Sequence, residues 1–253
     1  MKKKTVLIAF IAVILLAAVV AAGLHAVFTV AYIRASFTTH TPEGEVAAQE
    51  LKEKLNTYLN RSMTFLDIEE VRTTAQSNPR FRVVTAEKSF PSTIVLEIEE
   101  RSAAFVIRSQ EGYDVIDNEG VRIAQTQSAE NYVELTGDFS VSYENGVMTG
   151  NFVPELLQMY ASFIEILGEP RANLTSIFLT SGGAVTRLSR FRIETREGVE
   201  IVILNPSERV SELGIAAVQK YLSLQDAQRV RGSIVVQLVD EGKEVAAEYF
   251  TDR

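Results

Sequence analysis

The stretch FRVVTAEKSFPSTIVLEIEE, residues 81–100, contains two runs with a period-two pattern. The first run covers 81–86 and the second covers 94–99. A period of two is the pattern of a β-strand that turns one face toward a core. Pro91-Ser92 lies between the runs and is typical of a turn. We therefore expect an antiparallel hairpin at this point of the chain.

Two helices are expected before this hairpin. Residues 46–59 place four large side chains at helical spacing, namely Leu51, Leu55, Tyr58 and Leu59. Asp67, with Glu70 three residues later, forms a capping-box pattern that predicts the start of a second helix. This helix should end at Asn78-Pro79. A short strand at Ile33–Phe37 could precede both helices, and together these elements predict a small α+β domain.

Four stretches of this region, in this order, resemble the POTRA domain of bacterial FtsQ/DivIB cell-division proteins: Phe65-Leu66-Asp67-Ile68, Asn78-Pro79-Arg80-Phe81, Phe90-Pro91-Ser92-Thr93-Ile94 and Glu99-Glu100-Arg101. The resemblance implies an α+β protein with one N-terminal transmembrane helix, a small POTRA-type domain and a mostly β domain with two packed helices. The boundaries expected on this basis are a cytoplasmic tail at 1–4, a transmembrane helix at 5–30, a POTRA domain at 31–101, a β domain at 102–239 and a C-terminal strand or tail at 240–253.

The N-terminal run from Thr5 to Ile33 has no charged side chain. It exceeds the roughly 20 residues that a helix needs to cross a bilayer core. Lys2–Lys4 precede the run, so the positive-inside rule places the N-terminus in the cytoplasm and the bulk of the chain outside. A cleaved signal peptide is the alternative, with Ala21 and Gly23 at the cleavage site. The run, however, exceeds the ~7–15 apolar residues typical of a signal peptide.

The part after residue 101 is expected to be mostly β. Strands are predicted at 105–107, 113–116, 121–123, 177–179, 191–195, 199–203, 232–239 and 245–250. Helices are predicted at Pro154–Leu167 and at Pro206–Leu224, because each carries an apolar stripe at helical spacing.

Composition excludes several kinds of chemistry. The chain has no cysteine and only two histidines, which argues against thiolate nucleophiles, Cys-based metal sites and a Ser-His pair. Glu99 and Glu100 are neighbours in a predicted strand, so they should point to opposite faces and not converge for acid–base work. We predict no catalytic residue, cofactor, metal or small-molecule substrate, and expect that the protein is not an enzyme.

The charge balance excludes another class of partner. Lys2–Lys4 are three of the 25 basic residues, so the rest of the chain holds 22 basic and 33 acidic residues. Such an acidic surface repels nucleic acid, and we expect no nucleic-acid partner.

The resemblance implies that residues 232–250 bind a partner by strand addition at the end of the β domain. The candidate residues are Val235, Gln237, Val245, Ala247, Tyr249 and Phe250. The implied partners are FtsB/DivIC-like and FtsL-like single-pass membrane proteins. The implied function is a divisome scaffold at the septum of the cytoplasmic membrane, which helps couple division to septal peptidoglycan synthesis.

Two other functions stay open on the sequence alone. One is a membrane-anchored POTRA-like chaperone or polypeptide-binding module that is not involved in division. The other is an extracytoplasmic hydrolase, which would require a pocket that holds a nucleophile next to a base.

Overall fold

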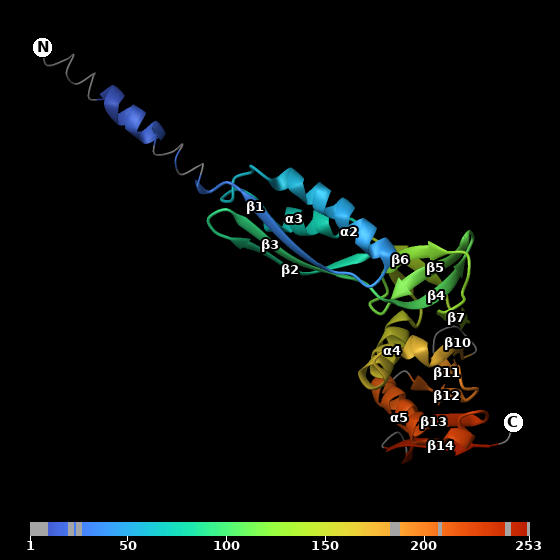
Figure 1. Ribbon diagram of the computed structural model, residues 1–253. Coiled ribbons are helices and arrows are strands. Elements are labelled where there is room, and N and C mark those ends of the chain that lie inside the picture. Colours follow the sequence, from blue (N-terminus) through green and yellow to red (C-terminus); the bar gives the residue numbers. More distant parts are fainter. Residues whose placement is uncertain are drawn as a thin grey trace, which may run out of the picture. The chain divides into compact units, whose positions relative to one another are not determined.

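The chain divides into two compact units, residues 1–101 and residues 102–253, in a computed structural model (Figure 1). The structure describes residues 10–19, 23, 27–182, 188–206, 209–240 and 244–251. Among these, no helix is long and apolar enough to cross a membrane. The predicted tail at 1–4 and parts of the predicted membrane helix at 5–30 lie outside the described residues.

The first unit is a three-stranded sheet with two helices on one face (Figure 1). Its elements are β1 (Tyr32–Thr38), α2 (Pro42–Leu55), η1 (Asn56–Tyr58), α3 (Ile68–Ala75), β2 (Phe81–Ser89) and β3 (Thr93–Glu100). The sheet order is β1-β3-β2, in which β3 runs parallel to β1 and antiparallel to β2. The alternating apolar residues of β2 and β3 face the helices, where Phe81, Ile94, Leu96 and Ile98 are almost fully buried.

Side-chain caps set where the helices of this unit begin. Thr41 Oγ1 accepts a hydrogen bond from the Gly44 N–H at 3.0 Å, so α2 begins at Pro42, four residues before the expected start at 46. Asp67 Oδ1 accepts from the Glu69 N–H at 3.0 Å and caps α3 as predicted. The expected capping box is incomplete, because the Glu70 carboxylate binds Arg61 Nη1 at 2.8 Å instead.

The second unit is built on a nine-stranded sheet. Its strands are β4 (Ala103–Ser109), β5 (Gly112–Asp117), β6 (Arg122–Thr126), β7 (Val133–Gly137), β10 (Leu174–Ser181), β11 (Leu188–Thr195), β12 (Glu200–Leu204), β13 (Ser233–Val239) and β14 (Glu244–Phe250). Its other elements are the hairpin of β8 (Val141–Glu144) and β9 (Val147–Gly150), the helices α4 (Val153–Leu167) and α5 (Val210–Ser223), and the 3-10 turns η2 (Pro170–Ala172) and η4 (Asp226–Gln228). The strand order is β14-β13-β12-β11-β10-β7-β4-β5-β6.

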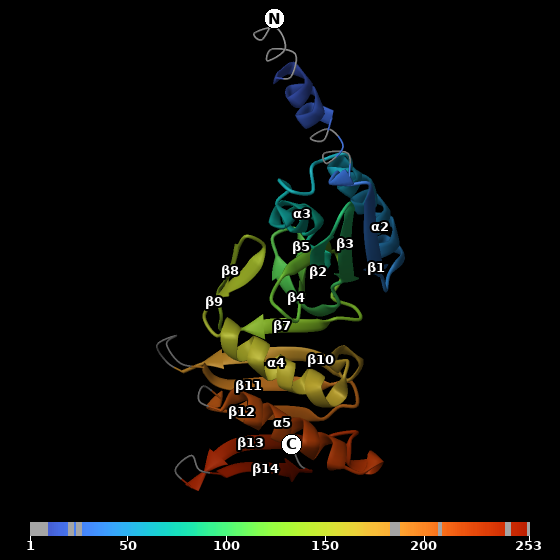
Figure 2. The same ribbon diagram turned by 90° about the vertical axis from the view of Figure 1, so that its left-hand side faces the viewer.

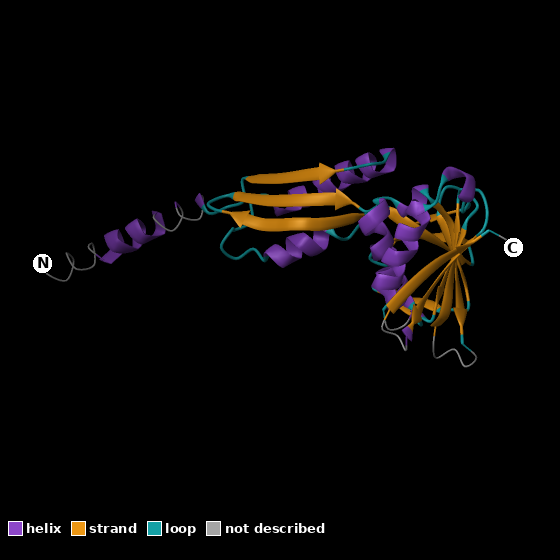
Figure 3. Cartoon of the chain, turned by 90° about the horizontal axis from the view of Figure 1, so that it is seen from below, coloured by secondary structure: helices purple, strands orange, loops and turns teal. Residues whose placement is uncertain are grey.

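The two helices connect parallel strands of this sheet. β7 and β10 are parallel neighbours, as are β12 and β13, and α4 and α5 lie in the respective connections. Both helices lie on the same face of the sheet (Figure 3), as crossovers of one hand require. The core lies beneath them and includes Phe105, whose ring packs edge-on against Tyr160 with centroids 4.3 Å apart.

These features confirm an α+β fold with a β-rich second part. The second helix of this unit begins at Val210, later than the predicted start at Pro206; residues 207 and 208 lie outside the described chain. The strands β7, β8 and β9 were not predicted.

Candidate partner-binding site

The strand β14 forms one edge of the nine-stranded sheet (Figure 2). It pairs antiparallel with β13 from Ser233↔Phe250 to Val239↔Glu244. Within the described part of the chain, no strand pairs with its other side. Alternate residues of an antiparallel edge strand point both backbone groups outward, so about half of the N–H and C=O groups of β14 are open to an added strand.

The six candidate residues fall on opposite faces of the sheet. Residues that pair directly across two strands share a face. Val245, Ala247 and Tyr249 are opposite Leu238, Val236 and Ile234 respectively, and these six pack against or within the helix-covered core.

The remaining three candidates lie on the uncovered face. Val235 is half-buried, Gln237 is exposed, and Phe250 is 45% exposed. Because neighbouring strands are about 4.8 Å apart, Val235 and Gln237 on β13 lie one strand behind the free edge. A strand added to β14 would therefore contact Phe250 directly, and would reach the β13 residues only if the partner also covered this face.

Tyr249 fixes β14 to its own chain. Its Oη lies 2.8 Å from the Arg231 carbonyl oxygen and 2.9 Å from that of Gln228, so its single hydrogen is shared between the two acceptors. Gly232, at φ +110°, makes room for this ring, because a Cβ there would lie 2.8 Å from Tyr249 Oη. Tyr249 thus positions the edge strand, whereas Phe250 is the aromatic side chain that the strand exposes.

The helix α5 packs against the covered face of the sheet next to the edge strand. Leu213 and Ala217 are fully buried in the core beneath the sheet. Tyr221, in the last part of the helix, donates a hydrogen bond to Glu197 Oε2 at 2.6 Å. Burial raises the pKa of Tyr221 to about 12, and the Glu197 carboxylate adds to the increase. The protonated hydroxyl attaches α5 to the turn between β11 and β12.

A row of side chains crosses the uncovered face, and Val235 is its one member among the candidate residues. Directly paired positions run from Phe178 through Arg192, Val202 and Val235 to Glu248 on β14. The Arg192 guanidinium lies 4.9 Å from the centre of the Phe178 ring and 3.6 Å from a Glu200 oxygen. Only the strand register brings these residues together, so alternation within each strand could not identify them.

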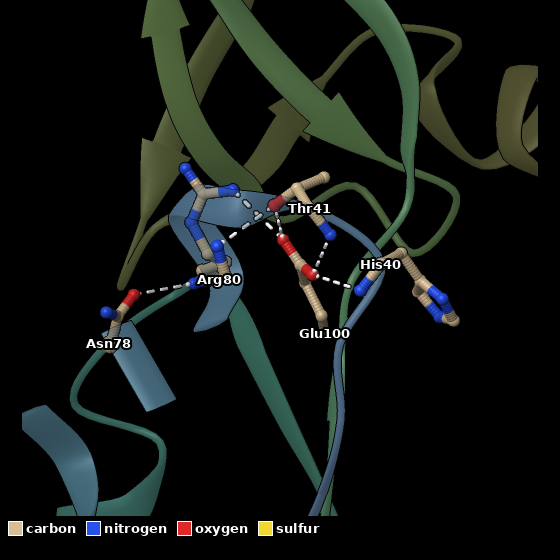
Figure 4. Close-up of polar contacts among 6 residues, drawn as sticks. His40, Thr41, Asn78, Arg80 and Glu100 are labelled. Atoms are coloured by element: carbon tan, nitrogen blue, oxygen red, sulfur yellow. Dashed lines mark hydrogen bonds and ion pairs between the residues drawn. The ribbon is translucent and has the colours of Figure 1, made fainter. Parts of the chain in front are cut away.

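Glu100 organises a second polar cluster, in the first unit (Figure 4). Its side chain is 1% exposed. Oε2 accepts from the backbone N–H of His40 at 2.6 Å and of Thr41 at 3.0 Å. Oε1 accepts from the Thr41 hydroxyl and from Arg80 Nη1, the latter at 3.1 Å. The neighbouring Glu99 points elsewhere and pairs with Arg82 at 2.8 Å.

The pKa of Glu100 reflects this arrangement. Burial alone raises the pKa, but the hydrogen bonds from Thr41, His40 and Arg80 outweigh burial and lower it below the ordinary value of 4.5. The donors of the cluster come from His40 and Thr41, directly before α2, and from Arg80, directly before β2. The ionised carboxylate at the end of β3 therefore connects the start of α2 to the start of β2.

The architecture of the first unit is that of a POTRA domain, a small module in which two helices cover a three-stranded mixed sheet. Residues 43–101 match the family model described as the POTRA domain, FtsQ-type. This part of the chain is therefore an FtsQ-type POTRA domain, and the match confirms the resemblance to the FtsQ/DivIB family that the sequence indicated. No curated protein matches the chain in sequence.

Proposed function

We propose that the chain is a membrane-anchored scaffold of the bacterial division machinery. Its N-terminus lies in the cytoplasm and residues 34–253 lie outside the cytoplasmic membrane. Its second unit binds FtsB/DivIC-like and FtsL-like single-pass proteins at the septum, and the assembly helps couple division to septal peptidoglycan synthesis. The chain works by binding and catalyses no reaction.

The observation that carries this proposal is the open edge of β14 in a chain with an FtsQ-type POTRA domain. A partner segment can add to this edge as an extra strand, with main-chain hydrogen bonds for affinity and alternate side chains for specificity. Tyr249 keeps the edge in place, and Phe250 offers an exposed aromatic contact beside it.

The proposed anchor is supported by the uncharged run Thr5–Ile33 and by the helical residues 10–19 within it. The large apolar side chains of this helical segment are 48% to 68% exposed. Side chains of this kind favour insertion by about 0.3–0.6 kcal/mol each on the translocon scale.

Cysteine cross-linking tests the partner edge directly, because the chain has no cysteine of its own. Glu248→Cys places a thiol on the exposed side of β14, and Gln125→Cys places one on β6 at the other edge of the same sheet. With single cysteines along the extracytoplasmic part of the FtsB/DivIC-like protein, we expect cross-links in cells from Glu248→Cys only. Equal cross-linking from both variants, or from neither while the two proteins still co-purify, would refute the β14 site.

Localisation tests the division role separately. A fluorescent fusion of the full chain should form a band at midcell in dividing cells. A uniform peripheral signal, with unfolded polypeptides bound regardless of sequence, would instead favour the membrane-anchored chaperone.

A further inference from the structure

One end of the POTRA domain is built from three uncharged segments, residues 27–33, 62–66 and 89–94. Backbone hydrogen bonds join them. The Met63 N–H donates to the Phe28 carbonyl at 2.7 Å, and the Ala31 N–H donates to the Ser92 carbonyl at 2.8 Å. The three segments therefore bring uncharged side chains together at this end, and the charged Arg61 borders them, since its carbonyl accepts a hydrogen bond from the Val30 N–H at 2.8 Å.

Aromatic side chains project from this surface without a role in the core. Phe65, in the loop before α3, is 89% exposed, and Phe90, in the β2–β3 turn, is 59% exposed. The Phe90 ring contacts the Phe28 ring edge-on, with centroids 6.2 Å apart. Val27 beside it is 52% exposed. A cluster of exposed apolar groups of this kind marks a surface that binds either a membrane or another protein.

The position of this surface in the chain indicates that it binds the membrane. β1 begins at this end of the domain (Figure 1), at Tyr32, where the uncharged N-terminal run ends. A helix that starts at Thr5 needs roughly 20 residues to cross the hydrocarbon core and leaves it near Leu24. Phe28 follows four residues later, and four residues span at most about 14 Å even when fully extended.

We propose that this end of the POTRA domain docks on the lipid bilayer surface, with the Phe65 and Phe90 rings in the interfacial layer. The inference rests on the proposed membrane anchor. Apolar and aromatic side chains of interfacial protein segments enter this layer by about 5–10 Å. The hydrogen bonds from Met63 to Phe28 and from Ala31 to Ser92 hold both aromatic loops beside the segment that follows the proposed anchor. A short tether and exposed aromatic side chains beside it thus favour the membrane over a soluble partner.

The docking would give the POTRA domain one fixed orientation on the membrane. With a single tether the domain could rotate freely about the exit segment. Contacts at Phe65 and Phe90 add two further points of attachment to the membrane, and three such points fix the orientation of the domain. The far end of the domain, where Glu100 and the start of α2 lie, then faces away from the lipid.

Tryptophan fluorescence provides the test, because the chain contains no tryptophan. The variants Phe65→Trp and Phe90→Trp each place one indole at the proposed contact, in the full chain reconstituted into phosphatidylcholine vesicles. Val46→Trp is the matched control, since Val46 is 63% exposed on α2 near the opposite end of the same domain. Leu16→Trp, measured with lipids brominated deep in the acyl chains, reports on the anchor, because position 16 would lie near the middle of the hydrocarbon core.

We expect lipids brominated near the headgroup to remove at least half of the emission at positions 65 and 90, and to leave position 46 unaffected. Aqueous iodide should show the reverse order. If the indole at position 16 is quenched by brominated lipid while those at 65 and 90 behave like the control, the docking is refuted and the anchor stands. If position 16 is also unquenched, the anchor and the docking both fail. Protection from iodide at position 65 without quenching by lipid would indicate a protein contact and would likewise overturn the docking.

Discussion

Replacing Glu100 by glutamine tests whether the buried carboxylate holds the POTRA domain together. The amide keeps the shape of the side chain but offers one acceptor oxygen in place of two. If this oxygen stays with the N–H groups of His40 and Thr41, the new NH₂ group faces Arg80 Nη1, which lies 3.1 Å from the native oxygen. Glu100→Gln therefore exchanges an ion pair for two donors that face each other.

The expected cost follows from the bonds that are lost. A hydrogen bond to a charged group contributes about 1.5–3 kcal/mol, and breaking a buried ion pair costs about 3–5 kcal/mol. Because Arg80 is 24% exposed and can turn toward water, we expect Glu100→Gln to lower the free energy of unfolding by about 3 kcal/mol, at the lower end of this range. For a domain of this size, that loss lowers the midpoint temperature of thermal unfolding by about 12–24 °C.

The matched control is Glu99→Gln. Glu99 and its partner Arg82 have side chains that are 44% and 47% exposed. Exposed pairs of this kind contribute about 0–1 kcal/mol. The control thus removes a carboxylate one residue away, on the same strand, with little expected loss of stability.

Hydrogen exchange of the full chain, followed by mass spectrometry, measures the effect where it arises. Peptides that cover residues 38–45 contain the N–H groups of His40 and Thr41. A loss of 3 kcal/mol should accelerate their exchange about a hundredfold. Thermal unfolding followed by circular dichroism gives the shift in midpoint. Equal effects of Glu99→Gln and Glu100→Gln would refute the assignment.

The effect of pH provides a second criterion. The folded-state pKa of Glu100 is lowered, so its contribution to stability is complete above the ordinary value of 4.5 and disappears as the pH falls through the lower folded-state value. The stability difference between the wild-type chain and Glu100→Gln should accordingly be largest near neutral pH and shrink in acid. A difference that stays constant below pH 4.5 would contradict an ionised Glu100.

Three further substitutions test other contacts. Gly44→Ala, which stabilises an ordinary helix by about 1 kcal/mol, should instead lower the unfolding midpoint, because the new Cβ would collide with the Glu100 carboxylate. Asp117→Ala should cost about 1–3 kcal/mol in urea unfolding, since Asp117 Oδ1 accepts from the Glu119 and Val121 N–H groups at 2.9 and 2.7 Å in the turn after β5. Tyr249→Phe should cost about 0.5–1.5 kcal/mol and speed hydrogen exchange in β14 but not in β11; unchanged exchange in β14 would show that the hydroxyl does not hold the edge.

Much of the first unit could be predicted because its signals are local. The alternation in residues 81–100 gives β2 and β3, and Asp67 marks the start of α3. The start of α2 was missed because its first turn, Pro42–Glu45, is polar and its cap, Thr41, lies before the apolar stripe. The burial of Glu100 could not be predicted, since its partners Thr41 and Arg80 are 59 and 20 residues away in sequence.

The second unit shows both a missed signal and a real limit. Asn145-Gly146 is the two-residue turn typical of a hairpin, and both residues have the positive φ that a type I′ turn requires, 52° and 81°. That signal would have identified β8 and β9. The division of the candidate residues between two faces, by contrast, depends on the pairing of β13 with β14. Neither strand's own alternation reveals which residues of one lie opposite which residues of the other.

The attachment of Tyr249 to the carbonyls of Gln228 and Arg231 has a consequence for binding kinetics. A terminal strand that had to order itself on contact would spend part of its interaction energy on lost conformational freedom. Here the strand is already in register with β13 before any partner arrives. Binding then orders only the incoming segment. Differences in affinity among partner sequences should therefore arise mainly from differences in their dissociation rate constants.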